Sequence, residues 1–326
     1  MEFFLLIKRV VFIQLIKMSE KISTIFFGTH DFAAKILQGL IDDPRISVDL
    51  VITQPDKPVG RKQKLQKPAV KILAEKHNLK ILQPSSLKTF DFKTLETFDL
   101  GICAQYGLLI NENILNAPKH GIINVHTSLL PKYRGASPIQ SALINGESET
   151  GITIMKMDKG LDTGPIILQK TLKIEPDDIF PDLEEKLSQI AILALSEAVF
   201  PYITGQIKPQ NQDNTQATNC REFNREDGRV DWSKTAQEIY NQYRGLTPWP
   251  GIWTTLGEKR LKLLKIKPVE FEINNSELLV KDNKIYIGCG YKSIEILELQ
   301  LEGNKPMDTK NFINGFANLL KNYKIK

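Results

Sequence analysis

The chain has 326 residues, of which 41% are hydrophobic and 25% are charged. This length favours two domains, and a composition close to the globular average argues against a disordered chain. Its three cysteines are too few and too scattered for a disulfide framework or a cysteine-based zinc site, so we expect a cytoplasmic protein.

Positive charge is concentrated in two parts of the chain. No acidic residue lies between Asp56 and Glu75, whereas six basic residues do, namely Lys57, Arg61, Lys62, Lys64, Lys67 and Lys71. From Ile207 onward, 19 Lys and Arg residues stand against 15 Asp and Glu residues. A basic loop and a basic C-terminal region suggest a polyanionic partner, although lysine-rich loops can also simply be solvated.

Residues 1–17 are expected to lie outside the fold, either as a dispensable extension or because translation starts further along the chain. The longest apolar run there has five residues, too few to span a bilayer, and no small-residue cleavage site of a secretory signal follows it. A membrane-surface anchor is the alternative. The segment after Met18 has the pattern of a domain start.

Strand and helix patterns alternate from residue 22 onward. Helices are predicted at 31–41, with Asp31 as the N-cap, and at 69–79, and strands at 22–28, 48–53, 80–82, 99–107 and 121–126. This alternation predicts an α/β domain with a parallel sheet covered on both faces, which binds ligands at the carboxyl ends of its strands. The chain lacks both a G-x-G-x-x-G fingerprint and a Walker A sequence, so a dinucleotide site is not supported.

The first domain continues with one short helix, two strands and one long helix. Ser137 and Pro138 predict the start of a helix, and this helix is expected to end near Asn145. Strands follow at 151–157 and 165–174. The long helix, 182–203, carries an apolar face. The polar segment after it is expected to be a linker, so we place the domains at 18–206 and 221–326, with the linker at 207–220.

Short strands dominate the second domain. A helix at 235–245 has the capping-box pair Thr235 and Glu238, and a final helix is expected at 308–323. Between them, strands are predicted at 251–256, 260–267, 277–280, 284–290 and 293–302. Antiparallel strands at this spacing predict a small β-barrel of the OB-like kind.

Two polar side chains stand out at the end of the strand at 121–126. Alternation places Asn124 and His126 on one side of this strand and Ile123 and Val125 on the other. Such polar groups are costly to bury without partners, but at an edge that faces a cleft they can bind a ligand. A hydrogen-bonded structural histidine is the alternative. No metal-binding cluster accompanies them, so we expect no metal ion.

A carboxylate is available in the glycine-containing loop DKGLDTGP, where Asp158 and Asp162 are equally placed and either can be a turn former. An amide, an imidazole and a carboxylate together suit acyl transfer to an amine, because two of them can stabilise an oxyanion and the third can take the amine proton. No Ser or Cys lies in a nucleophile elbow, which favours direct transfer over a covalent intermediate.

The segments INVHTSLLPKYRGASPIQ and ETGITIMKMDKGLDTGPII closely resemble the 10-formyltetrahydrofolate-dependent formyltransferases. The resemblance runs from about Met18 to the end of the chain through FFGTHDFAAKIL, TQPDKPVGRKQKL, AQYGLLI and LTPWPG, and the lysine-rich loop and the barrel narrow it to the methionyl-tRNA formyltransferases. His30, Gln105 and Thr127 depart from the pattern, which has Pro, a small residue and Gly there.

This resemblance implies a Rossmann-like catalytic domain that transfers formyl from 10-formyltetrahydrofolate to the α-amine of methionyl-initiator tRNA, for translation initiation. Asn124, His126 and Asp162 match the catalytic trio of the family. Ser128, Leu129, Leu130 and Pro131 match its folate-binding turn, and Arg61, with Lys62, Lys64 and Lys67, matches the loop that enters the acceptor stem. The barrel resembles a second tRNA-contacting domain. We expect a monomer with no membrane partner.

Two alternatives share parts of these features. One is a formyltransferase that acts on an amino sugar or another small amine, against which the lysine-rich loop argues. The other is a catalytically silent RNA-binding protein that kept the fold, against which the intact trio and folate turn argue.

Overall fold

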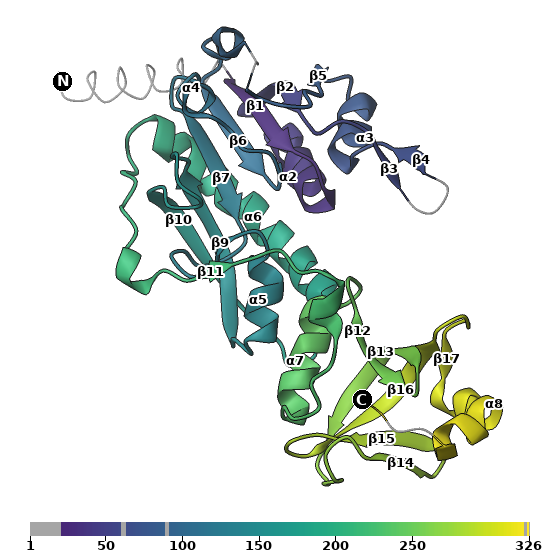
Figure 1. The fold of residues 1–326 in the computed structure, drawn as a ribbon. Helices are drawn as coiled ribbons and strands as arrows, with labels where there is room; N and C mark the ends of the chain where they lie inside the picture. Colours follow the sequence, from purple (N-terminus) through teal and green to yellow (C-terminus); the bar gives the residue numbers. More distant parts are fainter. Residues whose placement is uncertain (1–20, 60–62, 89–90, 323–324, 326) are drawn as a thin grey trace, which may run out of the picture. The chain divides into compact units, whose positions relative to one another are not determined.

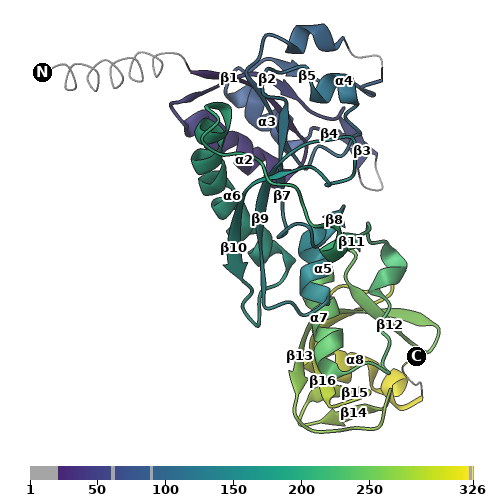
Figure 2. The same cartoon turned by 90° about the vertical axis from the view of Figure 1, so that its left-hand side faces the viewer.

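The chain forms two compact units, shown in Figure 1 and, turned by 90°, in Figure 2. The structure, a computed structural model, describes residues 21–59, 63–88, 91–322 and 325. The first unit contains the described residues up to Pro131, with 151–170 and 186–217, and the second contains 132–150, 171–185 and the chain from Thr218. The predicted extension at 1–17 lies outside the described residues.

A seven-stranded sheet forms the centre of the first unit. Its order is β10-β9-β7-β6-β1-β2-β5, with bounds β1 (Ile22–Gly28), β2 (Ile46–Ile52), β5 (Ile81–Leu82), β6 (Leu100–Ala104), β7 (Ile122–His126), β9 (Glu149–Lys156) and β10 (Ile166–Lys173). The first residues of β9 and the last residues of β10 are assigned to the second unit. The strands from β7 to β5 pair in parallel, whereas β9 pairs with β7 antiparallel. The sheet is therefore mostly parallel, as predicted.

Alternation along β1 divides the core of this unit between the two faces of the sheet. Ile25 and Phe27 pack with side chains from η1 (Phe92–Leu95) and α4 (Glu112–Leu115). On the other face, α2 (Asp31–Asp42) runs close to α6 (Phe180–Ile203), because a Cβ at Gly39 would lie 2.7 Å from a methyl group of Ile192. The helix α3 (Ala69–Lys76) packs beside α2.

Two local predictions need correction. The N-cap of α2 is His30, and Asp31 is the first residue of the helix. The Asp31 carboxylate is therefore in the first turn, where a negative charge interacts favourably with the helix dipole. The lysine-rich segment, predicted as a loop, contains a hairpin of β3 (Lys57–Val59) and β4 (Lys64–Gln66). Each of these three-residue strands has one apolar residue, Val59 or Leu65, which is too little alternation for a strand to be recognised.

The second unit contains the antiparallel β domain that the sequence predicts. Its sheet has the order β12-β13-β16-β15-β14, with β17 beside β16; the bounds are β12 (Ile252–Leu256), β13 (Lys259–Val269), β14 (Leu278–Lys281), β15 (Lys284–Gly288), β16 (Ser293–Leu301) and β17 (Met307–Asp308). Two register shifts occur in β13, between Leu263 and Ile266, where irregular pairing lets a strand bend.

The α-helices α5 (Pro138–Ile144), α7 (Ala236–Leu246) and α8 (Thr309–Asn322) lie within this unit, together with the start of α6. The predicted capping box of α7 is confirmed, since Thr235 and Glu238 bond each other's backbone. Ser137 is at the N-cap position of α5, as predicted, but its side chain makes no capping hydrogen bond. The core of the unit joins the helices to the sheet through Trp232, Ile239, Leu246, Leu263, Ile287 and Phe312.

The predicted linker at 207–220 contains η2 (Asn214–Gln216) and β11 (Asn219–Cys220), and β11 pairs with β8 (Arg134–Gly135). Gln210 exchanges two backbone hydrogen bonds with Ile166 of β10, of 2.7 and 2.8 Å. The first part of this segment is therefore attached to the sheet of the first unit.

Candidate active site

Asn124, His126 and Asp162 come together at the carboxyl end of β7, within the first unit. Asn124 Nδ2 lies 3.5 Å from Asp162 Oδ1, and His126 Nδ1 lies 3.6 Å from Asp162 Oδ2. His126 is only 5% exposed, and Ile123 and Val125 are buried on the opposite side of the strand. Distances of this length are common before substrates bind and tighten in the reacting complex. The side of the strand predicted to be functional is thus the one that meets the carboxylate.

The structure gives different contacts to the two aspartates, which spacing alone left equivalent and between which the family resemblance chose Asp162. Asp158 Oδ1 accepts hydrogen bonds from the backbone N–H of Gly160 (3.0 Å) and from the Thr163 hydroxyl (2.7 Å), so Asp158 forms the turn. Asp162 has a left-handed backbone, with φ of +53°, and its carboxylate faces Asn124 and His126. The loop then turns closely past β9, since a Cβ at Gly164 would collide with the Lys156 carbonyl oxygen.

The predicted folate turn, Ser128–Pro131, is held by two residues that the sequence analysis missed. The Thr153 hydroxyl donates to the Ser128 carbonyl oxygen (2.6 Å) and accepts from the Leu130 N–H (3.1 Å). Gln169 Nε2 donates to the Leu130 carbonyl oxygen (2.8 Å). Ser128 and Leu130 are buried, and Leu129 and Pro131 are partly exposed. Thr153 lies opposite His126 in the pairing of β7 with β9. The sequence alone does not show this pairing, so it could not identify Thr153.

The loop after β6 is fixed beside the same edge of the sheet. The carbonyl oxygen of Tyr106 accepts hydrogen bonds from the Thr29 hydroxyl (2.8 Å) and from Gln54 Nε2 (2.7 Å), which follow β1 and β2. Gln105, where the family pattern has a small residue, adopts φ of +42°. That backbone region is the one in which glycine is favoured.

Cys103, which pairs with Asn124 across β6 and β7, is the thiol nearest in register to the site. Burial raises the pKa of this thiol to about 12, so it is protonated at neutral pH and a poor nucleophile. We therefore expect Cys103→Ala to retain kcat within about threefold, since a residue that carries no covalent intermediate is dispensable for the chemistry. Steady-state formylation assays would check this, and a loss of two orders of magnitude in a folded variant would contradict it.

The predicted tRNA-binding residues have different environments. Arg61 and Lys62 lie outside the described residues. Lys64 is exposed on β4, whereas Lys67 Nζ lies 2.8 Å from Glu75 Oε2. Lys57 and Lys71 also have partners, Gln54 and Asp56. Part of the positive charge counted in the sequence is therefore neutralised locally or hydrogen-bonded at the base of the hairpin.

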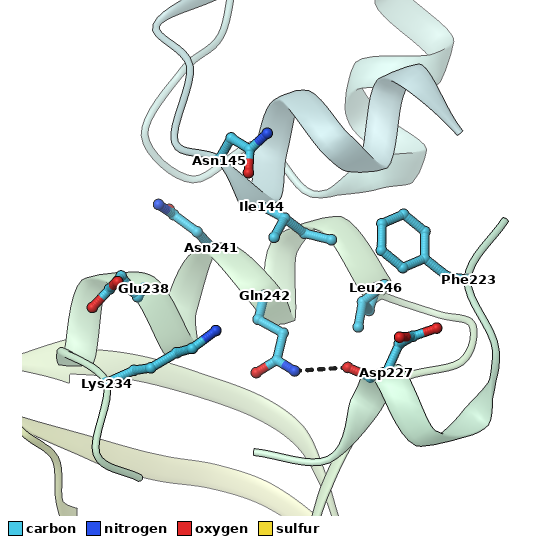
Figure 3. Close-up of a pocket in the computed structure, with 9 residues that line it drawn as sticks. All are labelled: Ile144, Asn145, Phe223, Asp227, Lys234, Glu238, Asn241, Gln242 and Leu246. Atoms are coloured by element: carbon cyan, nitrogen blue, oxygen red, sulfur yellow. Dashed lines mark hydrogen bonds between the residues drawn. The ribbon is translucent and has the colours of Figure 1, made fainter. Parts of the chain in front are cut away.

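A separate cavity of about 390 Å³ lies in the second unit, beside the end of α5 and along α7 (Figure 3). Part of its polar lining has structural partners: Glu238 caps α7, Asp227 pairs with Arg221, and Gln242 donates to the Asp227 carbonyl oxygen. None of the predicted site residues lines it. Within the described part of the chain, no three His, Cys, Asp or Glu side chains gather closely enough to hold a metal ion.

The comparisons with known proteins agree on one family. The sequence patterns of the formyl transferase family and of the formyl transferase C-terminal domain match residues 20–199 and 223–317. The methionyl-tRNA formyltransferase of Caldicellulosiruptor saccharolyticus is 43% identical over 90% of this chain and 96% of its own. The methionyl-tRNA formyltransferase of Geobacter sulfurreducens is 41% identical over 90% of this chain and 93% of its own.

Two solved structures share the fold. WlaRD, a sugar 3N-formyl transferase studied in the presence of dTDP and 5-N-formyl-THF, is 21% identical, with a TM-score of 0.64 over 88% of this chain and 100% of its own. HypX from Aquifex aeolicus in complex with tetrahydrofolic acid is 15% identical, with a TM-score of 0.61 over 93% of this chain and 50% of its own.

Proposed function

Because the chain belongs to the methionyl-tRNA formyltransferase family, we propose that it transfers the formyl group of 10-formyltetrahydrofolate to the α-amine of methionyl-initiator tRNA. The observation that carries this proposal is the convergence of Asn124, His126 and Asp162 at the end of β7. Its setting would be translation initiation in the cytoplasm, which suits three free cysteines.

The oxyanion of the reaction would form beside Asn124 and His126. The amine nitrogen attacks the formyl carbon, a C–N bond forms, and the carbonyl oxygen takes the negative charge of a tetrahedral intermediate. Hydrogen bonds from the two side chains stabilise that oxygen, and each such donor is worth about 10²–10³-fold in rate. The near-complete burial of His126 strengthens the effect, because little water competes for the charge.

Asp162 would manage the amine proton. Its carboxylate accepts or relays the proton that the attacking nitrogen loses, a role worth roughly 10²–10⁴-fold. The bond from the formyl carbon to N10 then breaks, and the proton ends on N10 of tetrahydrofolate. Asp162 Oδ2 also faces His126 Nδ1 and so orients the imidazole. Holding the two large substrates together supplies much of the remaining acceleration.

The folate would bind against Ser128, Leu129, Leu130 and Pro131. The support for this assignment is the rigidity of that turn, whose backbone is bonded to Thr153 and Gln169. A turn fixed in this way loses little conformational freedom when a ligand binds.

The tRNA would meet the hairpin β3–β4 and the C-terminal β domain, with Arg61, Lys62, Lys64 and Lys67 on its phosphates. Domain bounds of 18–206 and 221–326, with a linker at 207–220, and a monomeric state belong to the same proposal. A weak terminal base pair in the initiator would favour entry of the loop, since RNA ends are easier to read than A-form interiors.

Lys64→Ala is expected to raise the KM for methionyl-tRNA about three- to tenfold at low salt, and less at high salt, because one phosphate contact is lost. The KM for the folate donor should stay unchanged. Lys93→Ala, a change at another exposed lysine of the first unit, is the control. Formylation kinetics at two salt concentrations would check this, and equal effects of the two variants would exclude a specific role for Lys64.

A side-by-side comparison of acceptors tests the proposed function. The protein is given 10-formyltetrahydrofolate and either initiator methionyl-tRNA, elongator methionyl-tRNA or an amino-sugar nucleotide. We expect kcat/KM to be highest for the initiator. Preferred formylation of the amino sugar would overturn the proposal in favour of a sugar formyltransferase.

A further inference from the structure

A glutamine outside the predicted site holds the loop that carries Asp162. Gln212 Nε2 donates hydrogen bonds to the carbonyl oxygens of Asp162 (2.8 Å) and Gly164 (2.7 Å). One amide group therefore bonds the backbone on both sides of Thr163. Gln212 belongs to the segment that the sequence predicts as a linker.

The base from which Gln212 acts is fixed. Two residues earlier, Gln210 donates its N–H to the Ile166 carbonyl oxygen and accepts from the Ile166 N–H, at 2.8 and 2.7 Å. Ile166 is the first residue of β10, so the segment is attached to the same sheet that carries Asn124 and His126. One residue later, the Asp213 side chain accepts a hydrogen bond from the Thr215 N–H and caps the start of η2.

Asp162 needs such support because its backbone is in an unfavourable conformation. A φ of +53° is uncommon for a residue with a side chain, although aspartate tolerates it better than most, and contacts around the residue stabilise it. The bonds from Asp158 hold Gly160 and Thr163, on either side of Asp162. The bonds from Gln212 fix the Asp162 carbonyl itself, and with it the direction in which the carboxylate leaves the backbone.

We propose that Gln212 is a positioning residue, which keeps the Asp162 carboxylate aimed at Asn124 and His126. The inference rests on the role given to Asp162 in the proposed function. It makes the part of the segment from Gln210 to Gln212 a support of the active site. A displacement of about 1 Å in such a group is enough to cost on the order of 10²-fold in rate.

Gln212→Met tests this, because methionine has nearly the same length but no N–H group. We expect kcat to fall about 10–100-fold while the KM values for donor and acceptor change less than about threefold, since a misplaced group weakens only the transition state. Gln212→Asn keeps an amide on a shorter side chain, so its kcat should lie between those of Gln212→Met and the unaltered protein. Gln216→Met is the matched control in the same segment, since the Gln216 amide bonds the exposed Asp213.

Thermal melting of each variant shows whether it is folded, and each is assayed on the acceptor that the unaltered protein formylates. Failure of the unaltered protein on methionyl-tRNA counts against the proposed function alone. A kcat for Gln212→Met within twofold of the unaltered protein would overturn the inference.

A crystal structure of Gln212→Met gives a second readout that is independent of activity. We expect the 158–164 loop to be displaced and the Asp162 carboxylate to be farther from His126 Nδ1 than 3.6 Å. An unchanged loop would also overturn the inference.

Discussion

Asp162→Asn is expected to lower kcat for formyl transfer about 10²–10⁴-fold, which is the usual contribution of a proton acceptor. Asparagine has the same shape as aspartate and can keep the left-handed backbone, but its amide cannot take the amine proton. It also removes the negative charge that faces His126 Nδ1. Single-turnover assays at saturating substrates would measure the loss. Steady-state kinetics and thermal melting should show KM values and a thermal stability that are nearly unchanged.

Asp158→Asn is the matched control for this prediction. Its remaining side-chain oxygen can still accept from Gly160 and Thr163, so we expect kcat to stay within about threefold. The two variants make the same chemical change four residues apart in one loop. Near-normal formylation by Asp162→Asn, or an equal loss in both variants, would contradict the assignment of the two aspartates.

Asn124→Ala should give the second large effect, a fall in kcat of about 10²–10³-fold through loss of one oxyanion donor. The side chain is half-buried at the end of β7, and its amide is the group that points toward Asp162. Because the donor acts on charge that develops during the reaction, kcat/KM should fall with kcat. Steady-state kinetics with both substrates varied would measure it.

Val125→Ala provides the control, since Val125 is the next residue of the same strand and is buried on the opposite face. This truncation should lower the free energy of unfolding by about 1–3 kcal/mol, through lost apolar burial and the cavity left behind. Its kcat should change little. If both variants lost activity in proportion to stability, Asn124 would be a structural residue and the oxyanion role would be wrong.

The parts of the fold that depend on local pattern could be predicted from the sequence. Alternation in β7 placed Asn124 and His126 on one side, and the structure has them facing one carboxylate. The capping box of α7 needed only Thr235 and Glu238 three residues apart. These features arise from the 2.0 and 3.6 residue periods, which a sequence shows directly.

The parts that depend on tertiary contacts could not be predicted. Asp158 and Asp162 have equivalent local sequence patterns; the family resemblance chose Asp162, and the physical difference is the hydrogen bonds that Asp158 accepts from Gly160 and Thr163. Thr153 and Gln212 support the site from distant segments. Their roles follow from strand register and from the path of the polar segment after α6, for which the sequence has no local signal.

The formyl group is expected to pass directly from the folate to the α-amine at this edge of the sheet. This transfer is tested most directly by mixing the protein with 10-formyltetrahydrofolate labelled in the formyl carbon, adding initiator methionyl-tRNA, and following the label on folate, protein and tRNA over one turnover. We predict that label leaves the folate and appears on the methionine at the same rate, with none bound to the protein. Label that appears first on the protein, or that never reaches the tRNA, would contradict the account.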